Sequence, residues 1–221
     1  MELKEKPILF SASMVRAILG GQKTQTRRVI KKPLSEKIEN LLKLLRPCRR
    51  KKYEYMGDGR GSEVNLKPFA FPGQHLWVRE TWADVNTEDG PAICYRADGS
   101  YRSWRDFSKS FGPDYGAGPS MDYDAYPGNY SAWWEDLLNR DIHKEGGYCW
   151  RPSIFMPRWA SRLKLEVTNV AIERLHDVDD KKARSEGTED RASFRRLWEE
   201  INGLKSWESN PCVWVIDFRS L

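Results

Sequence analysis

The first apolar run of the chain, PILFSA at residues 7–12, predicts a short strand. MVRAIL follows with apolar positions at helical spacing, and the pair Gly20-Gly21 is a typical stop signal for a helix. Ser11 or Ser13 is the expected N-cap of this helix. The next segment, TQTRRVI, is rich in β-branched residues and predicts a second strand.

Alternating positions return in the middle of the chain. In FPGQHLWVRETWA, residues 71–83, Pro72-Gly73 marks a turn, and one strand is expected to follow it. That strand would carry Glu80 and Trp82 on the same apolar face. AICYRADG, residues 92–99, predicts another strand that ends in a turn. The alternation after Leu163 predicts a half-buried strand that continues to Ile172.

The last part of the chain alternates helical and strand patterns. Residues 177–187 have an acidic first turn and a glycine stop, and residues 190–202 form a clearer amphipathic pattern with Ile201 on its apolar face. Residues 213–218, VWVIDF, are apolar on both faces, as in a central strand. An earlier segment, residues 34–45, also has helical periodicity.

Predicted strands outnumber predicted helices, and their connections are uneven. This pattern favours an α+β fold, a small and mostly antiparallel β-barrel with flanking helices, over a doubly wound parallel sheet. We expect one domain over residues 1–221 with insertions at about 34–68 and 100–148. The second insertion is long and rich in Tyr and Trp, and it includes a short helix near SAWWEDLLN.

Charge is distributed unevenly along the chain. Residues 1–52 carry 15 Lys and Arg against 4 Asp and Glu, a net of +11, whereas the remainder has a net of −6. A basic N-terminal part favours an anionic partner, with RNA or a modified nucleoside first and DNA second. The alternative for RPCRRKK, residues 46–52, is a loop that its charges keep solvated.

The composition also narrows the classes of site. No apolar run of about 18 residues occurs, so no membrane partner is expected, and the N-terminus lacks the pattern of a secretory signal, which favours a cytoplasmic protein. The four cysteines form no CxxC pair and the three histidines are scattered, so we expect free thiols, no metal and no cofactor.

Four segments together resemble a known family. ILGGQKTQTRRV, PGQHLWVRETW, ARSEG and the closing VWVIDF resemble the ASCH domain, a member of the PUA-like β-barrel superfamily. The family signature falls on Gly21, Lys23, Thr26 and Arg28. The likeness is greatest to ASCH proteins carried by prophages of enteric bacteria, which share the RETWA and PRWASR segments. It covers both ends of the chain and weakens over the two insertions.

The resemblance implies binding of RNA or of a modified base. A small bacterial relative in this family is an amidohydrolase that removes the acyl group of N4-acetylcytidine, and its catalytic set falls here on Lys23, Thr26 and Glu186. Some ASCH proteins are linked to ribonuclease activity, in which Lys23 and Arg28 would stabilise the phosphoryl transition state. The chain departs from the family's usual Gly-Asp by having Gly73-Gln74, and it is about twice as long as the small hydrolase.

Elementary chemistry is compatible with a hydrolase. Thr26 offers a hydroxyl nucleophile, and Glu186 could protonate the leaving amine or orient Lys23. Lys23 could act as a base only if burial or the neighbouring Arg27 and Arg28 lower its pKa from about 10.4. Otherwise Lys23 would stabilise an anion, or would simply be a solvated lysine at a helix C-terminus.

A second group of residues can also be interpreted either as a binding site or as part of the core. The expected ligand-binding residues, besides Gly21 and Arg28, are Glu80, Trp82, Arg158, Trp159 and Arg162. Two cations around an aromatic ring suit a nucleotide. The alternatives are a core tryptophan, a structural closure of the barrel, and a buried Glu80 that pairs with a cation such as Arg28. A non-catalytic nucleic-acid-binding module, and an interaction protein that uses its aromatic insertion, also stay open.

Overall fold

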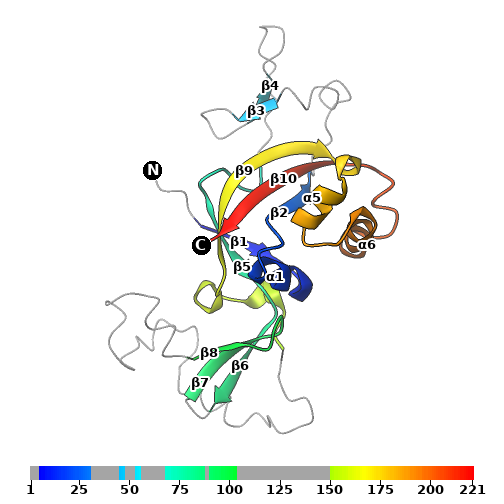
Figure 1. The fold of residues 1–221 in the computed structure, drawn as a ribbon. Coiled ribbons are helices and arrows are strands. Elements are labelled where there is room, and N and C mark those ends of the chain that lie inside the picture. Colours follow the sequence, from blue (N-terminus) through cyan, green and yellow to red (C-terminus); the bar gives the residue numbers. More distant parts are fainter. Residues whose placement is uncertain (1–4, 31–44, 48–52, 56–67, 88–89, 104–149) are drawn as a thin grey trace. The chain divides into compact units, whose positions relative to one another are not determined.

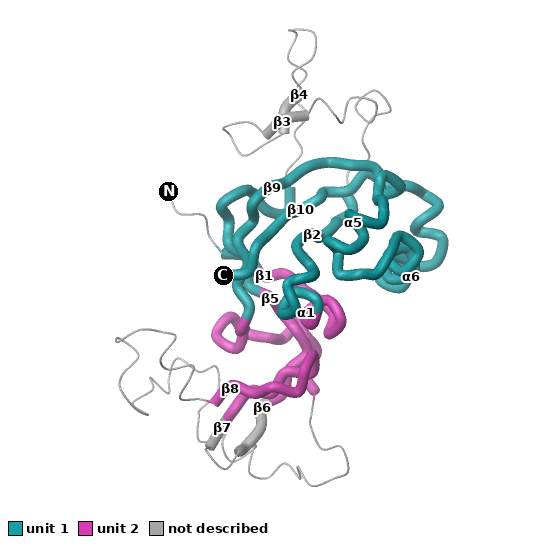
Figure 2. Tube along the Cα trace, in the orientation of Figure 1, with its two compact units in different colours: residues 1–6, 17–77, 163–221 teal, residues 7–16, 78–162 magenta. Residues whose placement is uncertain are grey.

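The computed structural model describes residues 5–30, 45–47, 53–55, 68–87, 90–103 and 150–221 (Figure 1). The chain divides into two compact units, each assembled from segments that are distant in the sequence (Figure 2). Unit 1 comprises residues 1–6, 17–77 and 163–221, and unit 2 comprises residues 7–16 and 78–162.

The largest sheet has five strands. Their order is β1 (Lys6–Leu9), β5 (His75–Arg79), β9 (Lys164–Arg174), β10 (Cys212–Ser220) and β2 (Gln25–Val29). β10 runs antiparallel to both β9 and β2, and its residues from Cys212 to Ile216 are all buried. The prediction of a central apolar strand near the end of the sequence is therefore confirmed. Within the described strands the order runs from β1 to β2 without closing into a barrel.

Two smaller sheets complete the strand inventory of the described residues. One has the order β6 (Trp82–Thr87), β7 (Gly90–Tyr95) and β8 (Tyr101–Ser103), and the other pairs β3 (Leu45–Pro47) with β4 (Tyr53–Tyr55). Together with the helices they confirm a mixed α+β fold.

The single strand predicted after the Pro72-Gly73 turn is wrong, because two strands occupy that segment. β5 ends at Arg79 and β6 begins at Trp82. The backbone of Trp82 exchanges hydrogen bonds with Arg151, at 3.3 and 2.7 Å, and this pairing starts a new strand. Glu80 and Trp82 therefore do not lie on one face of one strand.

The helices begin where capping side chains are available. α1 (Ala12–Leu19) follows Ser11, whose hydroxyl accepts from Met14 N at 3.4 Å. Asp179 caps α5 (Asp180–Ser185) and Asp190 caps α6 (Arg191–Asn202), each accepting a backbone N–H at 2.7 Å. Three of the predicted helices are therefore confirmed.

α6 packs on a core cluster of unit 1. The cluster is formed by Leu175, Val178, Ala183, Phe194, Trp198, Trp207, Val213 and Val215. Phe194 and Trp198 are one helical turn apart and face Val213 and Val215 of β10. Ile201, predicted on the same face, is 53% exposed because it lies in the last turn of α6, beyond Trp198.

Several predictions fall outside the described residues. They include the helix at 34–45, of which only Leu45 is described, and most of the insertion at 100–148. The single-domain assignment and the two insertions stay predictions. In the described part of the chain, no helix is both long and apolar enough to span a bilayer.

Candidate functional site: a buried ion cluster in unit 1

Lys23 lies in the turn that joins α1 to β2. The backbone N–H groups of Gln22 and Lys23 both donate to the Ala17 carbonyl, at 2.8 and 2.9 Å, and Gly21 N donates to Ile18 O. Gly21 adopts a φ of 70°, which glycine reaches at little cost. Thr24 N then donates to Ser185 O at the end of α5, so the turn is held against that helix. This packing leaves Lys23 only 2% exposed.

The ammonium group of Lys23 has an oxygen acceptor for each of its three hydrogens. Its Nζ donates to Glu186 Oε2 at 2.7 Å, to the Glu186 carbonyl at 2.8 Å and to the Gln25 carbonyl at 2.8 Å. Because a protonated lysine has three donors and no acceptor, this geometry suits the charged form. The structure thus brings two of the three predicted catalytic residues, Lys23 and Glu186, into direct contact.

Arg27 holds the other oxygen of the Glu186 carboxylate. Its Nη1 donates to Glu186 Oε1 at 2.9 Å and to Gln25 Oε1 at 2.6 Å, and its Nη2 contacts Glu173 Oε2 at 3.3 Å. Gln25 in turn donates to Asp217 Oδ1 at 2.6 Å. Each carboxylate oxygen of Glu186 is therefore fixed by a different cation, which orients the group without freedom to rotate.

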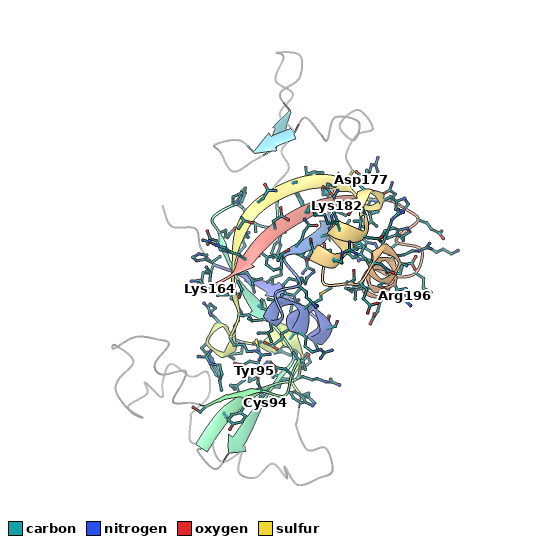
Figure 3. The ribbon with its side chains drawn as sticks, viewed as in Figure 1. Cys94, Tyr95, Lys164, Asp177, Lys182 and Arg196 are labelled. Atoms are coloured by element: carbon teal, nitrogen blue, oxygen red, sulfur yellow. The ribbon has the colours of Figure 1, made fainter. Side chains whose placement is uncertain are left out.

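The network reaches the surface at Lys182. Its Nζ lies 3.1 Å from both carboxylate oxygens of Glu173 and donates to the Asp177 carbonyl at 3.1 Å. Figure 3 labels Lys182 and Asp177 close together in unit 1. The half-buried Glu173 is thus shared between buried Arg27 and half-exposed Lys182.

Electrostatics in the cluster act on Lys23 in both directions. Burial lowers the pKa of Lys23 from its usual value of 10.5, the Glu186 carboxylate opposes this, and the charges of Arg28 and Arg27 add to the lowering. The net direction is downward. Burial also lowers the pKa of Arg28, against the charge of Glu186. Of Lys23 and Arg28, Lys23 is therefore the side chain for which loss of a proton is less costly.

Gly187 allows the close approach of the α5 end to the Lys23 turn. It adopts a φ of 83°, and a Cβ at this position would lie 2.7 Å from the Cβ of Ala17 and 3.1 Å from that of Lys23. A residue with a Cβ would fit here only if the end of α5 moved away from α1 and the Lys23 turn. The glycine of ARSEG is therefore required both as a helix stop and as a spacer for the ion pair.

Thr26 and Arg28 lie on the other face of β2. Thr26 is paired with Ile216 and Arg28 with Trp214, whereas Arg27 is paired with Val215, whose side chain belongs to the core cluster. Since side chains alternate along a strand, Thr26 points to the face opposite Arg27. Thr26 is buried, and no hydrogen bond within the described residues joins its hydroxyl to Lys23 or Glu186.

Unit 2 contains a second ion cluster, centred on Arg162. Its Nε and Nη2 contact the two carboxylate oxygens of Glu80 at 2.8 and 2.9 Å, and its Nη1 donates to Asp98 Oδ2 at 2.8 Å and Ser100 Oγ at 2.6 Å. The guanidinium lies 4.1 Å from the ring centroid of Tyr95. The buried Glu80 was expected to need a cation, and the structure assigns Arg162 to it rather than Arg28.

The pKa values of this cluster follow from burial and hydrogen bonding. Burial raises the pKa of Glu80, against the hydrogen bond from Arg162. Burial also acts to raise the pKa of Asp98, but hydrogen bonds from Arg162 and Ser100 lower it to about 2. For Arg162, the carboxylates outweigh burial and raise its pKa overall.

The tryptophans of unit 2 pack as core residues. Trp82 is 5% exposed and shares a cluster with Ile93, Tyr95, Met156 and Ala160. Its ring meets that of Trp159 edge-on at 6.3 Å, and the guanidinium of Arg151 lies 5.2 Å from its centroid. These contacts favour the structural interpretation of Trp82 over base stacking. Arg158 and Trp159 lie in the 3-10 helix η5 (Arg158–Ala160), where Arg158 is exposed.

The ten predicted site residues therefore belong to two groups. Unit 1 holds Gly21, Lys23, Thr26, Arg28 and Glu186, and unit 2 holds Glu80, Trp82, Arg158, Trp159 and Arg162. Sequence reasoning missed Arg27 and Glu173 as members of the Lys23 cluster. The available signal was the pairing of Gln25 and Arg27 on one strand face, which marks a polar face that needs partners.

Metal binding finds no geometric support in the described residues. No group of three or more His, Cys, Asp or Glu side chains within them is arranged to hold an ion. Cys94 and Cys212 are free thiols, as expected, while Cys48 and Cys149 lie outside the described residues.

Comparison with models of protein families, with curated proteins and with solved structures finds no match to this chain. A functional assignment must therefore come from the residues and their geometry.

Proposed function

We propose that this chain is an ASCH-type protein, with a PUA-like β-barrel fold, that binds RNA or a modified nucleoside. One observation carries the proposal. Lys23 of the GGQKTQTRR motif and Glu186 of ARSEG are 163 positions apart, yet they form a buried ion pair at 2.7 Å. The resemblance to the family implies that these two residues lie together in one site. Their local sequences alone do not predict this contact.

The fold is compatible with this proposal. In the five-stranded sheet, β5 pairs with β9, β9 with β10 and β10 with β2, all antiparallel, and β2 with the motif lies at one end of the order. The small β-barrel is part of the proposal, because the described strands by themselves do not close into one. The face of β2 that carries Thr26 and Arg28 is the natural ligand face, because the opposite face is filled by Arg27, Glu186 and the helices.

Binding of a base needs fixed donors and acceptors more than it needs a mobile proton. Lys23 and Arg27 orient Glu186 from both sides, and the saturated ammonium group of Lys23 is a rigid positive charge. On the ligand face, the charge of Arg28 would attract a phosphate or a polar base edge, while Thr26 contributes a hydroxyl. Binding is therefore the primary function that we propose.

Hydrolysis of an N4-acylated cytidine is the second candidate, favoured by the lowered pKa of Lys23. Neutral Lys23 would take the proton of Thr26 as Oγ bonds to the acyl carbon. The C–N4 bond would then break, and the amine would leave as cytidine with a proton from the Lys23–Glu186 pair. Water would hydrolyse the acyl-threonine to the free acid. This route requires the Lys23 amine to release one of its three oxygen contacts and to reach the Thr26 hydroxyl, with which it makes no hydrogen bond in the structure.

The test is turnover of N4-acetylcytidine, followed by chromatography, with Thr26→Val and Thr26→Ser. Valine keeps the shape of threonine and removes the hydroxyl, so a hydrolase should lose at least about 100-fold in rate, while serine retains measurable activity. Exposed Thr24, two residues earlier on the chain, provides the matched control Thr24→Val. Equal turnover by the wild type and Thr26→Val would exclude the nucleophile.

Absence of turnover in every variant would leave the binding function. Calorimetric titration with N4-acetylcytidine and with cytidine would then measure affinity directly. The ribonuclease alternative predicts cleavage of labelled RNA by metal-free protein, and intact RNA after incubation would contradict it. A chain that neither binds nor converts a nucleoside or RNA would overturn the proposed function.

A further inference from the structure

Three polar side chains form a row across neighbouring strands of unit 1. In the register of the five-stranded sheet, Asp217 of β10 is paired with Gln25 of β2 on one side and with Asn169 of β9 on the other. Gln25 Nε2 donates to Asp217 Oδ1 at 2.6 Å, and Asn169 Nδ2 donates to Asp217 Oδ2 at 3.0 Å. Each oxygen of this carboxylate therefore has an amide donor, and the Asp217 side chain is fixed from both sides.

The amide of Gln25 has one orientation that suits this row. Its Oε1 accepts from Arg27 Nη1 at 2.6 Å, while its Nε2 donates to Asp217. A guanidinium only donates and a carboxylate only accepts, so a reversed amide would place donor against donor and oxygen against oxygen. Asp217 therefore selects the orientation in which Gln25 presents an acceptor to Arg27.

The position of Arg27 depends on this acceptor. Its Nη1 donates one hydrogen to Gln25 and one to Glu186 Oε1, at 2.6 and 2.9 Å. Its Nη2 contacts Glu173 at the longer distance of 3.3 Å, and its Nε has no hydrogen-bond partner among the described residues. Without the Gln25 acceptor, the guanidinium would be free to turn toward Glu173 and to release Glu186.

We propose that Gln25 and Asp217 are positioning residues for the Lys23–Glu186 pair. Asp217 orients the Gln25 amide. The amide directs Arg27 onto Glu186 Oε1, which leaves Oε2 to Lys23. The inference rests on the proposed function, in which the Lys23–Glu186 pair belongs to the site, and it adds two residues that the family resemblance does not imply.

The first variant removes the amide. Gln25→Met keeps the length of the side chain and removes the acceptor for Arg27. We expect the affinity for N4-acetylcytidine, or for a labelled oligouridylate if the wild type binds only RNA, to fall by roughly 2- to 30-fold. Glu166→Gln, which changes the exposed pair with Arg219 on the same two strands, β9 and β10, is the matched control and should leave the affinity unchanged.

The second test exchanges the amide and the carboxylate. Gln25→Glu keeps an oxygen for Arg27 but sets a carboxylate against Asp217 Oδ1, and the repulsion should also weaken binding by roughly 2- to 30-fold at about pH 8. The double variant Gln25→Glu/Asp217→Asn keeps the net charge and again matches a donor with an acceptor. Its affinity should return to within about 3-fold of the wild type.

The pH dependence distinguishes this repulsion from a general loss of stability. Among the described residues, Asp217 and Arg27 are the charged side chains that contact the Gln25 side chain, and an arginine does not titrate in this range. A carboxyl beside a second carboxylate has a raised pKa, and once protonated it donates to its neighbour. The deficit of Gln25→Glu should therefore shrink between about pH 8 and about pH 5, whereas the double variant should show no such trend.

A measurement without ligand follows Arg27 directly. A guanidinium held by fixed hydrogen bonds gives separate NMR signals for its Nη protons, and rotation about the Cζ–Nη bonds averages them. We expect separate signals in the wild type and in the double variant, and averaged signals in Gln25→Met. Urea midpoints check that every variant is folded under the conditions used.

Each outcome has a distinct meaning. Wild-type affinity in Gln25→Met, or a failure of Asp217→Asn to restore Gln25→Glu, would overturn the positioning role and leave the proposed function intact. A wild type that binds neither probe would overturn the proposed function. The Arg27 signals would then still decide the positioning role, because separate signals in Gln25→Met would overturn it.

Discussion

The ion clusters of the two units share an arginine that bridges two carboxylates, and the cluster of unit 1 adds a buried lysine. In unit 1, Arg27 bridges the carboxylates of Glu186 and Glu173, and in unit 2, Arg162 bridges those of Glu80 and Asp98. Unit 1 adds Lys23, whose pKa burial lowers. In unit 2 the bridging cation has its pKa raised by its carboxylates, against burial.

This difference distinguishes a cluster that only fixes geometry from one whose charge can change. Arginine keeps its proton under all ordinary conditions, so a carboxylate–arginine–carboxylate bridge fixes geometry and does nothing else. A buried lysine on the same frame can change its charge when a ligand or a neighbour alters its surroundings. Under the proposed function, the chemistry therefore belongs to unit 1, and the Arg162 cluster fixes the geometry of unit 2.

The largest expected effect is that of Lys23→Met. It leaves Glu186 Oε2 and two carbonyl oxygens without their donor in a buried place. We expect the free energy of unfolding in urea to fall by about 3–5 kcal/mol. The control is Arg219→Met, which breaks the pair with Glu166 at a 67% exposed side chain and should cost at most about 1 kcal/mol. Equal costs would contradict the view that Lys23 is a buried member of a network.

A smaller effect is expected for Arg162→Met, about 1–3 kcal/mol in the free energy of unfolding. Glu80 loses two hydrogen bonds, but it can escape an unpaired charge by binding a proton, because burial already raises its pKa.

The sign of the pH dependence tests this explanation. A carboxyl whose folded pKa is raised loses stability as pH increases through that pKa, so the deficit of Arg162→Met should be larger at about pH 8 than at about pH 5. A deficit that grows toward acid pH would show that Glu80 is not the group responsible.

The smallest effect concerns Asp98. Its pKa is about 2 when folded against an ordinary 3.8, so its contribution is complete above about pH 4 and is lost as the pH falls toward 2. Asp98→Asn should remove this part of the acid sensitivity in a urea titration series. Because the side chain is 31% exposed, we expect less than about 1 kcal/mol. Identical acid profiles for the wild type and the variant would contradict the assigned hydrogen bonds.

The sequence predicted those elements whose formation depends on residues close together in the chain. The acidic first turn and the glycine stop predicted α5, apolar positions at helical spacing predicted α6, and the apolar run of β10 predicted a central strand. The pair of Lys23 and Glu186 was expected through the family resemblance, and the structure brings them together. Whether Thr26 acts with them stays a prediction.

The missed features all depend on long-range partners. The strand after Pro72-Gly73 alternates smoothly in sequence, and only the pairing of Trp82 with Arg151 shows where it breaks. The expected burial of Glu80 predicted that it pairs with a cation. It did not identify Arg162, because that contact depends on how distant segments pack. Arg27 was expected only as a charge beside Lys23, because its partners Glu186 and Glu173 come from elements more than 140 positions away.

The distance of 163 positions between Lys23 and Glu186 also sets an order of events during synthesis. At 5–20 residues per second, the ribosome makes Glu186 roughly 10–30 s after Lys23. β10, which pairs with β2, follows later still. Throughout that interval GGQKTQTRR is a hydrated, fully charged segment, and a chain that stops short of ARSEG carries the motif without ever assembling the cluster.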